Sequence, residues 1–276
     1  MKVLKAINNN VVSCVDAEGR ELVVMGRGLG FRAKTGDILD PTSAEKIFRM
    51  DSAEKTDQFK ELITRLPPEL FELCNKIIDR AQSALGHRLN ESIYLTLTDH
   101  IHFALSRTRQ KMDLPNPLET EVRVFYPVEY AVGQYALEEI HAQMGVSLAE
   151  DEASSIALHF VNAEYDSSMS ATMRAVQVLP AMIRILEDWP GLKLNKNHLF
   201  FDELIVHIKF LAVQAISGVN QEWVGSQLAE AVRQHFPDEY LCAGEMIRCL
   251  SEKRGNSVPD AEQAYLALCI HRACIS

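Results

Sequence analysis

The sequence contains no continuous apolar run of about 18 residues, so a membrane-spanning helix is not expected. Residues 1–12 also lack a long apolar stretch and do not resemble a secretion signal. The six cysteines form no CxxC pair and have no zinc-site spacing: Cys14, Cys74, Cys242, Cys249, Cys269 and Cys274. In a chain of this length they indicate reduced, mostly buried thiols, a cytoplasmic location and no disulfide scaffold.

Positive charge is scarce, because the 276-residue chain has a formal net charge of −10. The scarcity is uneven along the chain. Residues 1–55 hold nine Lys/Arg and eight Asp/Glu, whereas the remaining residues hold 19 and 30. Only the first segment can therefore approach a polyanion without strong general repulsion.

Residues 1–50 have the pattern of short strands separated by turns. Apolar and β-branched residues gather in segments that are bounded by Asn-rich or Gly-containing turns. The expected strands are Lys2–Ile7, Val11–Val15, Glu21–Met25 and Lys46–Met50. Together they predict a small four-stranded antiparallel sheet, which would be marginally stable alone and would gain from dimerising.

The segment Gly26–Phe31 is a glycine-rich loop with one aromatic residue. Its glycines resemble a dinucleotide-binding motif, but no helix is expected to follow them, which disfavours that function. The polar and aromatic residues of this region suit RNA, because amides read base edges and an aromatic ring stacks on bases. These residues are Lys5, Asn8, Asn10, Arg27, Phe31, Arg32 and Lys34. The alternative is that the asparagines and glycines serve only as turn residues.

From about Ser52 the apolar residues recur at helical spacing, and this helical part is internally repeated. Shifting residues 122–163 by 110 positions gives eleven identities in 42 pairs, against about two or three expected from composition. Upstream of that range the offset is 107. The pairs include Arg123/Arg233, Pro127/Pro237, Tyr130/Tyr240, Glu152/Glu262, Leu97/Leu204, His100/His207 and Phe103/Phe210. A duplicated all-helical domain explains them.

The repeat singles out histidines at equivalent positions. His100 is equivalent to His207, and His159 is equivalent to Cys269. A neutral, partly exposed imidazole can accept a phosphoryl group and so gain strong negative charge. The alternative is a set of core histidines held by backbone carbonyls. Metal binding is not expected, because His100 and His102 are two residues apart and face different sides of a helix.

Several of these segments resemble a known family, the transcriptional antiterminators of the BglG/LicT/SacY type. The co-antiterminator RNA-binding domain of that family is similar to Ile7–Val11, Val23–Phe31 and Lys34–Gly36. The first PTS regulation domain is similar to Ser92–His100 and Glu152–His159, and the second to Leu204–Phe210. The resemblance covers essentially the whole chain in the family's order.

The resemblance implies a homodimer that binds a hairpin in leader mRNA and so lets polymerase read into a sugar-utilisation operon, with β-glucosides as the expected sugars. It implies RNA contacts at Lys5, Asn8, Asn10, Gly26, Arg27, Phe31 and Arg32. It also implies phosphoacceptors at His100, His159 and His207. Phosphate from the sugar-specific Enzyme II on the first regulation domain would silence the protein, and phosphate from HPr on the second would favour activity. The family commonly has a fourth histidine where this chain has Cys269, so His207 is the expected main acceptor of the second domain.

We therefore expect a multidomain protein. A small antiparallel all-β RNA-binding domain at 1–55 should precede two homologous all-α helical-bundle domains at 60–168 and 170–276. The protein should be a regulator without cofactor or metal, and not an enzyme. One alternative is a DNA-binding activator with the same regulatory domains, which should begin with a helix-turn-helix. Another is a phosphocarrier enzyme, which would need an onward transfer site.

Overall fold

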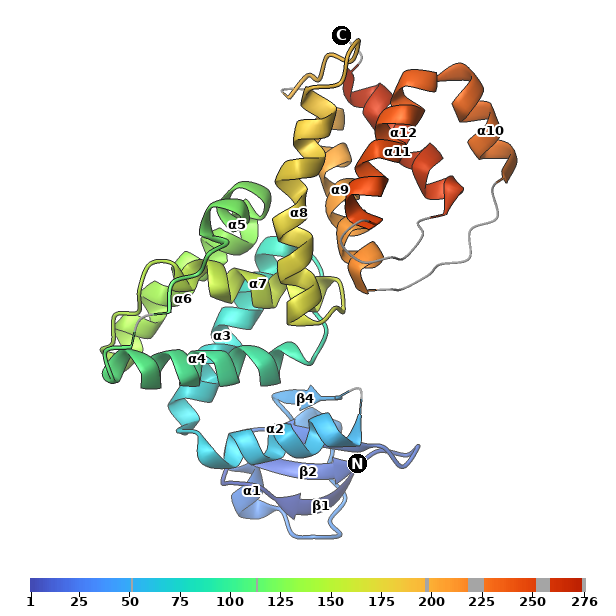
Figure 1. The fold of residues 1–276 in the computed structure, drawn as a ribbon. Coiled ribbons are helices and arrows are strands. Elements are labelled where there is room, and N and C mark those ends of the chain that lie inside the picture. Colours follow the sequence, from blue (N-terminus) through green and yellow to red (C-terminus); the bar gives the residue numbers. More distant parts are fainter. Residues whose placement is uncertain (51, 113, 197–198, 218–225, 252–258, 275–276) are drawn as a thin grey trace. The chain divides into compact units, whose positions relative to one another are not determined.

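The structure is a computed structural model that describes residues 1–50, 52–112, 114–196, 199–217, 226–251 and 259–274 (Figure 1). Contacts divide the chain into two compact units. The first comprises Met1–Asn116 and Val128–Glu164, and the second comprises Pro117–Pro127 and Tyr165–Ser276. No helix among the described residues is both long enough and apolar enough to cross a membrane.

The first unit begins with the predicted four-stranded antiparallel sheet, whose strands follow one another in the order β1-β2-β3-β4. The strands are β1 (Lys2–Ala6), β2 (Val11–Val15), β3 (Glu21–Met25) and β4 (Lys46–Phe48). The register pairs Val12 with Val24 and Cys14 with Leu22, so these residues share one face of the sheet. They form a small core with Leu29 on that face. The expectation of a β-sheet followed by helices is confirmed.

The glycine-rich segment contains a single helical turn, α1 (Leu29–Arg32), and the expectation that no helix follows these glycines was wrong. Gly28 precedes the turn with a φ of 65°, a left-handed conformation that favours glycine. Leu29 is buried and anchors the turn to the sheet. A turn of four residues is too short to leave a helical period in the sequence.

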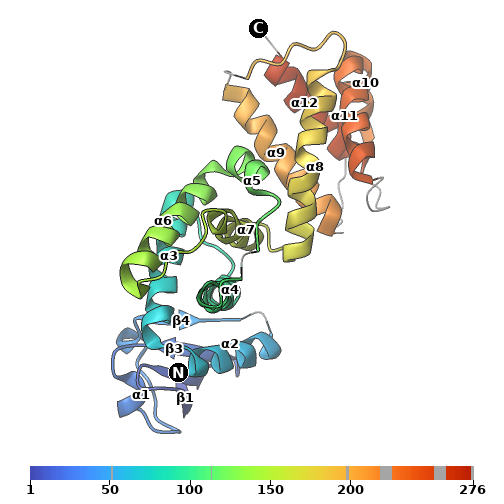
Figure 2. The same cartoon turned by 60° about the vertical axis from the view of Figure 1, so that its left-hand side comes forward.

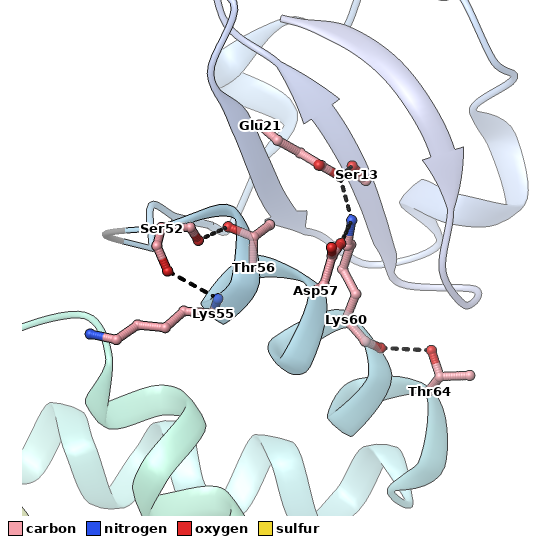
Figure 3. Close-up of polar contacts among 8 residues, drawn as sticks. All are labelled: Ser13, Glu21, Ser52, Lys55, Thr56, Asp57, Lys60 and Thr64. Carbon is pink, nitrogen blue, oxygen red and sulfur yellow. Dashed lines mark hydrogen bonds and ion pairs between the residues drawn. The ribbon is translucent and has the colours of Figure 1, made fainter.

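Helix α2 (Ala53–Arg65) follows the sheet and is tied to it by charge (Figure 3). Its first turn is capped by Ser52, whose hydroxyl accepts a hydrogen bond from the backbone N–H of Lys55 at 3.2 Å. Further along, the Lys60 ammonium lies 2.7 Å from a carboxylate oxygen of Glu21 on β3. The same ammonium lies 2.6 Å from Asp57 on its own helix. Lys60 therefore holds the helix against the second face of the sheet.

That second face of the sheet shares a hydrophobic core with the helices of unit 1. The ring of Phe48 on β4 lies 5.1 Å from that of Phe59 on α2 and 4.8 Å from that of Tyr94. Val11 and Val23 belong to the same core. Edge-to-face aromatic pairs of this kind add to the free energy gained by burial. Each face of the sheet thus contributes residues to a hydrophobic core within the chain.

The remaining helices of unit 1 carry the first repeat (Figures 1 and 2). They are α3 (Pro68–Leu85), α4 (Ile93–Arg109), α6 (Pro127–Met144) and α7 (Glu152–Glu164). Gly133 on α6 allows close approach to α7, since a Cβ there would lie 2.1 Å from the carbonyl oxygen of Ala153. This close contact helps to place α7 beside the rest of the bundle.

In its described residues the second unit contains helices and no strands, and it carries the second repeat. Its helices are α5 (Glu119–Phe125), α8 (Met169–Glu187), α9 (Leu199–Ser217), α10 (Ser226–His235), α11 (Pro237–Ser251) and α12 (Asp260–Cys274). Helix α5 belongs to the first repeat by sequence but packs against α8. Just after α5, the buried ring of Tyr126 lies 4.4 Å from the Lys209 ammonium of α9. The predicted boundaries at 60–168 and 170–276 stay predictions.

Candidate functional site

The loops at one end of the sheet are held together by the asparagines that the sequence singled out. The Asn8 side-chain oxygen accepts a hydrogen bond from the backbone N–H of Asn10 at 2.9 Å. The Asn10 side-chain oxygen accepts one from the N–H of Gly28 at 2.9 Å. The backbone N–H groups of Gly30 and Phe31 both donate to the carbonyl of Asn9. The loop between β3 and β4 is therefore fixed to the β1–β2 turn.

The glycines of this loop serve close packing. A Cβ on Gly30 would lie 1.9 Å from the carbonyl oxygen of Asn8, and a Cβ on Gly26 would lie 2.8 Å from that of Ser43. Gly26 is buried, and its N–H donates to the carbonyl of Asn10 at 2.9 Å. Its N–H is thus engaged inside the protein, although the family resemblance implies an RNA contact at Gly26.

Several predicted binding residues of this region are exposed: Lys5, Arg27, Phe31, Arg32 and Lys34. The ring of Phe31 is 83% exposed, although it stands on a turn that is anchored on both sides. The Arg32 guanidinium donates to the carbonyls of Gly28 at 3.3 Å and Arg27 at 2.9 Å, which holds it above the loop. The result is a fixed surface that offers positive charge and one aromatic face.

In unit 1 the structure brings together the two histidines that the repeat had marked. His100 on α4 and His159 on α7 have ring centroids 4.7 Å apart, with their planes tilted by 43°. Both line a cavity of about 540 Å³, to which α2 contributes Arg65 and Glu61. Residues 59 positions apart therefore form one site.

A buried carboxylate lies behind the first of these histidines. Nε2 of His100 lies 3.0 Å from Oε2 of Glu152 on α7. The other oxygen of Glu152 accepts a hydrogen bond from the Arg107 guanidinium of α4, and both of these side chains are buried. Sequence reasoning missed Arg107. It noted Glu152 only as a repeat identity, although a carboxylate repeated within an apolar helix was a usable signal.

Burial sets the protonation of these imidazoles. It lowers the pKa of His100 to about 4, and the positive charge of Arg107 acts in the same direction. Burial lowers the pKa of His159 well below its usual value, with a smaller contribution from His100. Both rings are therefore neutral near pH 7, the form in which imidazole is a nucleophile.

Unit 2 keeps the histidine and the glutamate of this arrangement, but both the arginine and the second histidine are replaced. Nε2 of His207 on α9 lies 3.7 Å from Oε2 of Glu262 on α12, too far for a hydrogen bond. The position equivalent to Arg107 holds Gln214. Burial lowers the pKa of His207 to about 4 and raises the pKa of Glu262. The ring of Tyr265 packs edge-on at 4.5 Å from that of His207.

Cys269, the equivalent of His159, is a poor nucleophile, and His271 two residues later lies in a different setting. Cys269 is buried, and burial raises the pKa of its thiol to about 11. Nδ1 of His271 lies 2.8 Å from Oε1 of Glu239 on α11, and its ring packs on Phe236. Neither contact directs His271 toward His207.

The fold and the sites together define a multidomain regulator, in which a small binding domain precedes two related helical domains with neutral, half-buried histidines. Family comparison agrees with this class. Residues 1–57 match the family model described as CAT RNA binding domain, and residues 75–163 and 181–273 match the PRD domain.

Known relatives span almost the whole chain. The transcription antiterminator LicT of Bacillus subtilis (strain 168) is 36% identical over 272 residues, which cover 99% of this chain and 98% of the relative. The Beta-glucoside operon antiterminator of Dickeya chrysanthemi is 36% identical, with 99% and 96% covered. The crystal structure of GlcT CAT-PRDI has a TM-score of 0.52 at 35% identity, covering 59% of this chain and 96% of that one. The chain belongs to the family of transcription antiterminators that carry a CAT RNA binding domain and two PRD domains.

Proposed function

We propose that the protein holds a hairpin of leader mRNA and so prevents termination of a sugar-utilisation operon. The relative named Beta-glucoside operon antiterminator supports β-glucosides as the inducing sugars. The observation that carries the proposal is the loop Gly26–Arg32, whose backbone is fixed while Phe31 is 83% exposed. An exposed ring on a fixed loop is a stacking platform for an unpaired base.

The proposed RNA contacts are Lys5, Asn8, Asn10, Gly26, Arg27, Phe31 and Arg32. The asparagines retain their amide N–H groups for base edges, because only their oxygens are engaged by the loop. A gel shift that compares leader RNA with duplex DNA of the same sequence tests the assignment. Retention of the RNA alone is expected, and preference for the duplex would favour the DNA-binding activator instead.

Replacing Arg27 should weaken RNA binding. Arg27→Ala removes an exposed guanidinium from the loop that also carries Phe31 and should cost about 1–3 kcal/mol of binding free energy if it contacts a base or phosphate. Arg20→Ala is a matched control, because Arg20 is exposed on the β2–β3 turn and paired with Asp16 and Glu18. Titrations at one salt concentration measure both affinities. An equal loss of RNA affinity in the two variants would show that Arg27 contributes only general positive charge.

The proposed phosphoacceptors are His100, His159 and His207. Their support is that burial keeps each imidazole neutral near pH 7. Phosphate from the sugar-specific Enzyme II on His100 or His159 would silence the protein, and phosphate from HPr on His207 would favour activity. In this proposal the protein receives phosphate as a signal and is not an enzyme.

The second regulation domain should have one acceptor. His207→Ala should abolish phosphate on residues 170–276 when the full chain is incubated with HPr, Enzyme I and phosphoenolpyruvate. Burial raises the pKa of the Cys269 thiol to about 11, so little thiolate is present at pH 7 and Cys269 should not substitute. Mass spectrometry under non-acidic conditions locates the label. Cys269→Ala is the control and should keep the phosphate on residues 170–276. Phosphate that persists there in His207→Ala would contradict the assignment.

We further propose that the protein acts in the cytoplasm as a homodimer, with an RNA-binding domain at 1–55 and regulation domains at 60–168 and 170–276. The balanced charge of residues 1–55 against the acidic remainder supports this division of roles.

A further inference from the structure

We infer that His100 and His207 accept phosphate on Nδ1, that His159 accepts it on Nε2, and that Glu152 is the positioning residue that sets the nitrogen used by His100. The inference rests on the proposed phosphorylation of these histidines and names the atom at which it occurs.

The hydrogen bond behind His100 fixes its tautomer. The Glu152 carboxylate is paired with Arg107 and can therefore only accept a hydrogen bond from the imidazole. Nε2 of His100 must carry the hydrogen that it donates at 3.0 Å. The lone pair of the neutral ring is then on Nδ1, which makes no hydrogen bond within the part of the chain that the structure describes.

His207 presents the same nitrogen to the equivalent carboxylate. Nε2 of His207 is buried without a hydrogen-bond partner among the described residues, and it faces Oε2 of Glu262 at 3.7 Å. A buried nitrogen cannot reach a phosphoryl donor. Two helices that are equivalent by sequence thus turn Nε2 inward and leave Nδ1 for the chemistry.

His159 is oriented the other way. Its Nδ1 is the buried atom and has no hydrogen-bond partner among the described residues, while the side chain lines the cavity that it shares with His100. The nitrogen left for a donor is Nε2. One cavity therefore holds two imidazoles that offer different nitrogens.

The transfer needs no further reactant. A phosphorylated side chain of the donor protein loses its bond to phosphorus, whose electron pair stays on the donor atom, while the Nδ1 lone pair of His100 forms the new N–P bond. The hydrogen on Nε2 stays in place, so the acceptor ring gains positive charge as the bond forms. The Glu152 carboxylate lies beside that charge, in the arrangement by which a carboxylate supports an imidazolium in hydrolytic triads.

The nitrogen that carries the phosphate at each histidine can be measured directly. The full chain, labelled with ¹⁵N-histidine, is phosphorylated with phosphoenolpyruvate, Enzyme I and HPr, or with the sugar-specific Enzyme II. Long-range ¹H–¹⁵N correlation then reports the substituted nitrogen, and isomer-specific antibodies on separated peptides give a second measurement on the unmutated chain. We expect Nδ1-phosphate on the peptides of His100 and His207, and Nε2-phosphate on that of His159. Nε2-phosphate at His100 or His207 would overturn the inference while leaving the proposed function intact. A chain with no phosphohistidine would overturn both the inferred nitrogen atoms and the proposed phosphorylation.

The positioning role has its own test. Glu152→Gln keeps the size of the side chain and a neutral hydrogen-bonding group but loses the charge that fixes the tautomer. We expect the ratio of Nδ1- to Nε2-phosphate at His100 to fall by about tenfold or more, because either tautomer can then face the amide. Glu150→Gln, two residues away and exposed, is the matched control and should leave the ratio unchanged. An unchanged ratio in Glu152→Gln would show that the carboxylate is only structural.

Discussion

Arg107→Ala should lower the free energy of unfolding of the first unit by about 3–5 kcal/mol, because it leaves the buried carboxylate of Glu152 without its charged partner. Gln214→Ala, at the equivalent position of the second unit, removes no charge and should cost much less. Urea unfolding followed by circular dichroism measures both losses. Faster hydrogen exchange of the backbone amides in α4 and α7 would show that the loss in Arg107→Ala arises in these helices.

A double replacement distinguishes the effect of the two charges on stability from the effect of side-chain volume. Arg107→Met combined with Glu152→Leu removes both charges and keeps the site filled, so it should recover most of the stability lost in Arg107→Ala. The same double variant should not recover normal phosphorylation of His100, since the group behind Nε2 is then apolar. A loss below 1 kcal/mol in Arg107→Ala would show that water reaches Glu152 readily.

Phosphate on His100 and phosphate on His159 should exclude each other. The ring centroids are 4.7 Å apart, so two phosphoryl groups would share one cavity. Two groups of about −1.5 charge held roughly 7 Å apart repel by about 5 kcal/mol at an effective dielectric of 20. Such a free energy is close to the ~5.5 kcal/mol that turns a 1:99 equilibrium into 99:1.

Intact-protein mass spectrometry tests this exclusion. Chains with two phosphates should carry one in each regulation domain, and peptide mapping should find His100 and His159 modified together far less often than independent sites would be. His100→Ala should increase the label on His159, because the competing charge is absent. Abundant double modification within the first unit would contradict the prediction and would require α4 and α7 to separate.

Local patterns predicted the strands well, and comparing the chain with itself at an offset of about 110 residues predicted the helical repeat. The bounds of β2 and β3 agree with the prediction, because each is a short run rich in apolar residues that is bounded by turn residues. Helix α1 was missed because four residues carry no helical period.

The candidate site was predictable only in part. The repeat located His100 and His159, but their contact depends on how α4 packs on α7. Arg107 lies in the polar stretch Ser106–Arg109, which looks like a solvated helix end in the sequence. Only a partner 45 residues away makes it a buried residue. Pairings of that kind follow from tertiary packing and leave no local signal.

The aromatic cluster around Phe48 has a consequence for how the chain can be divided. Because Phe48, Val11 and Val23 share their core with α2, α3 and α4, a cut after residue 55 would expose that face of the sheet to water. The excised sheet would then have to find a substitute apolar surface, and another excised sheet offers the same residues. The helices of the same chain and the sheet of a second chain therefore compete for this face. The residue at which the protein is truncated decides which of the two contacts an experiment observes.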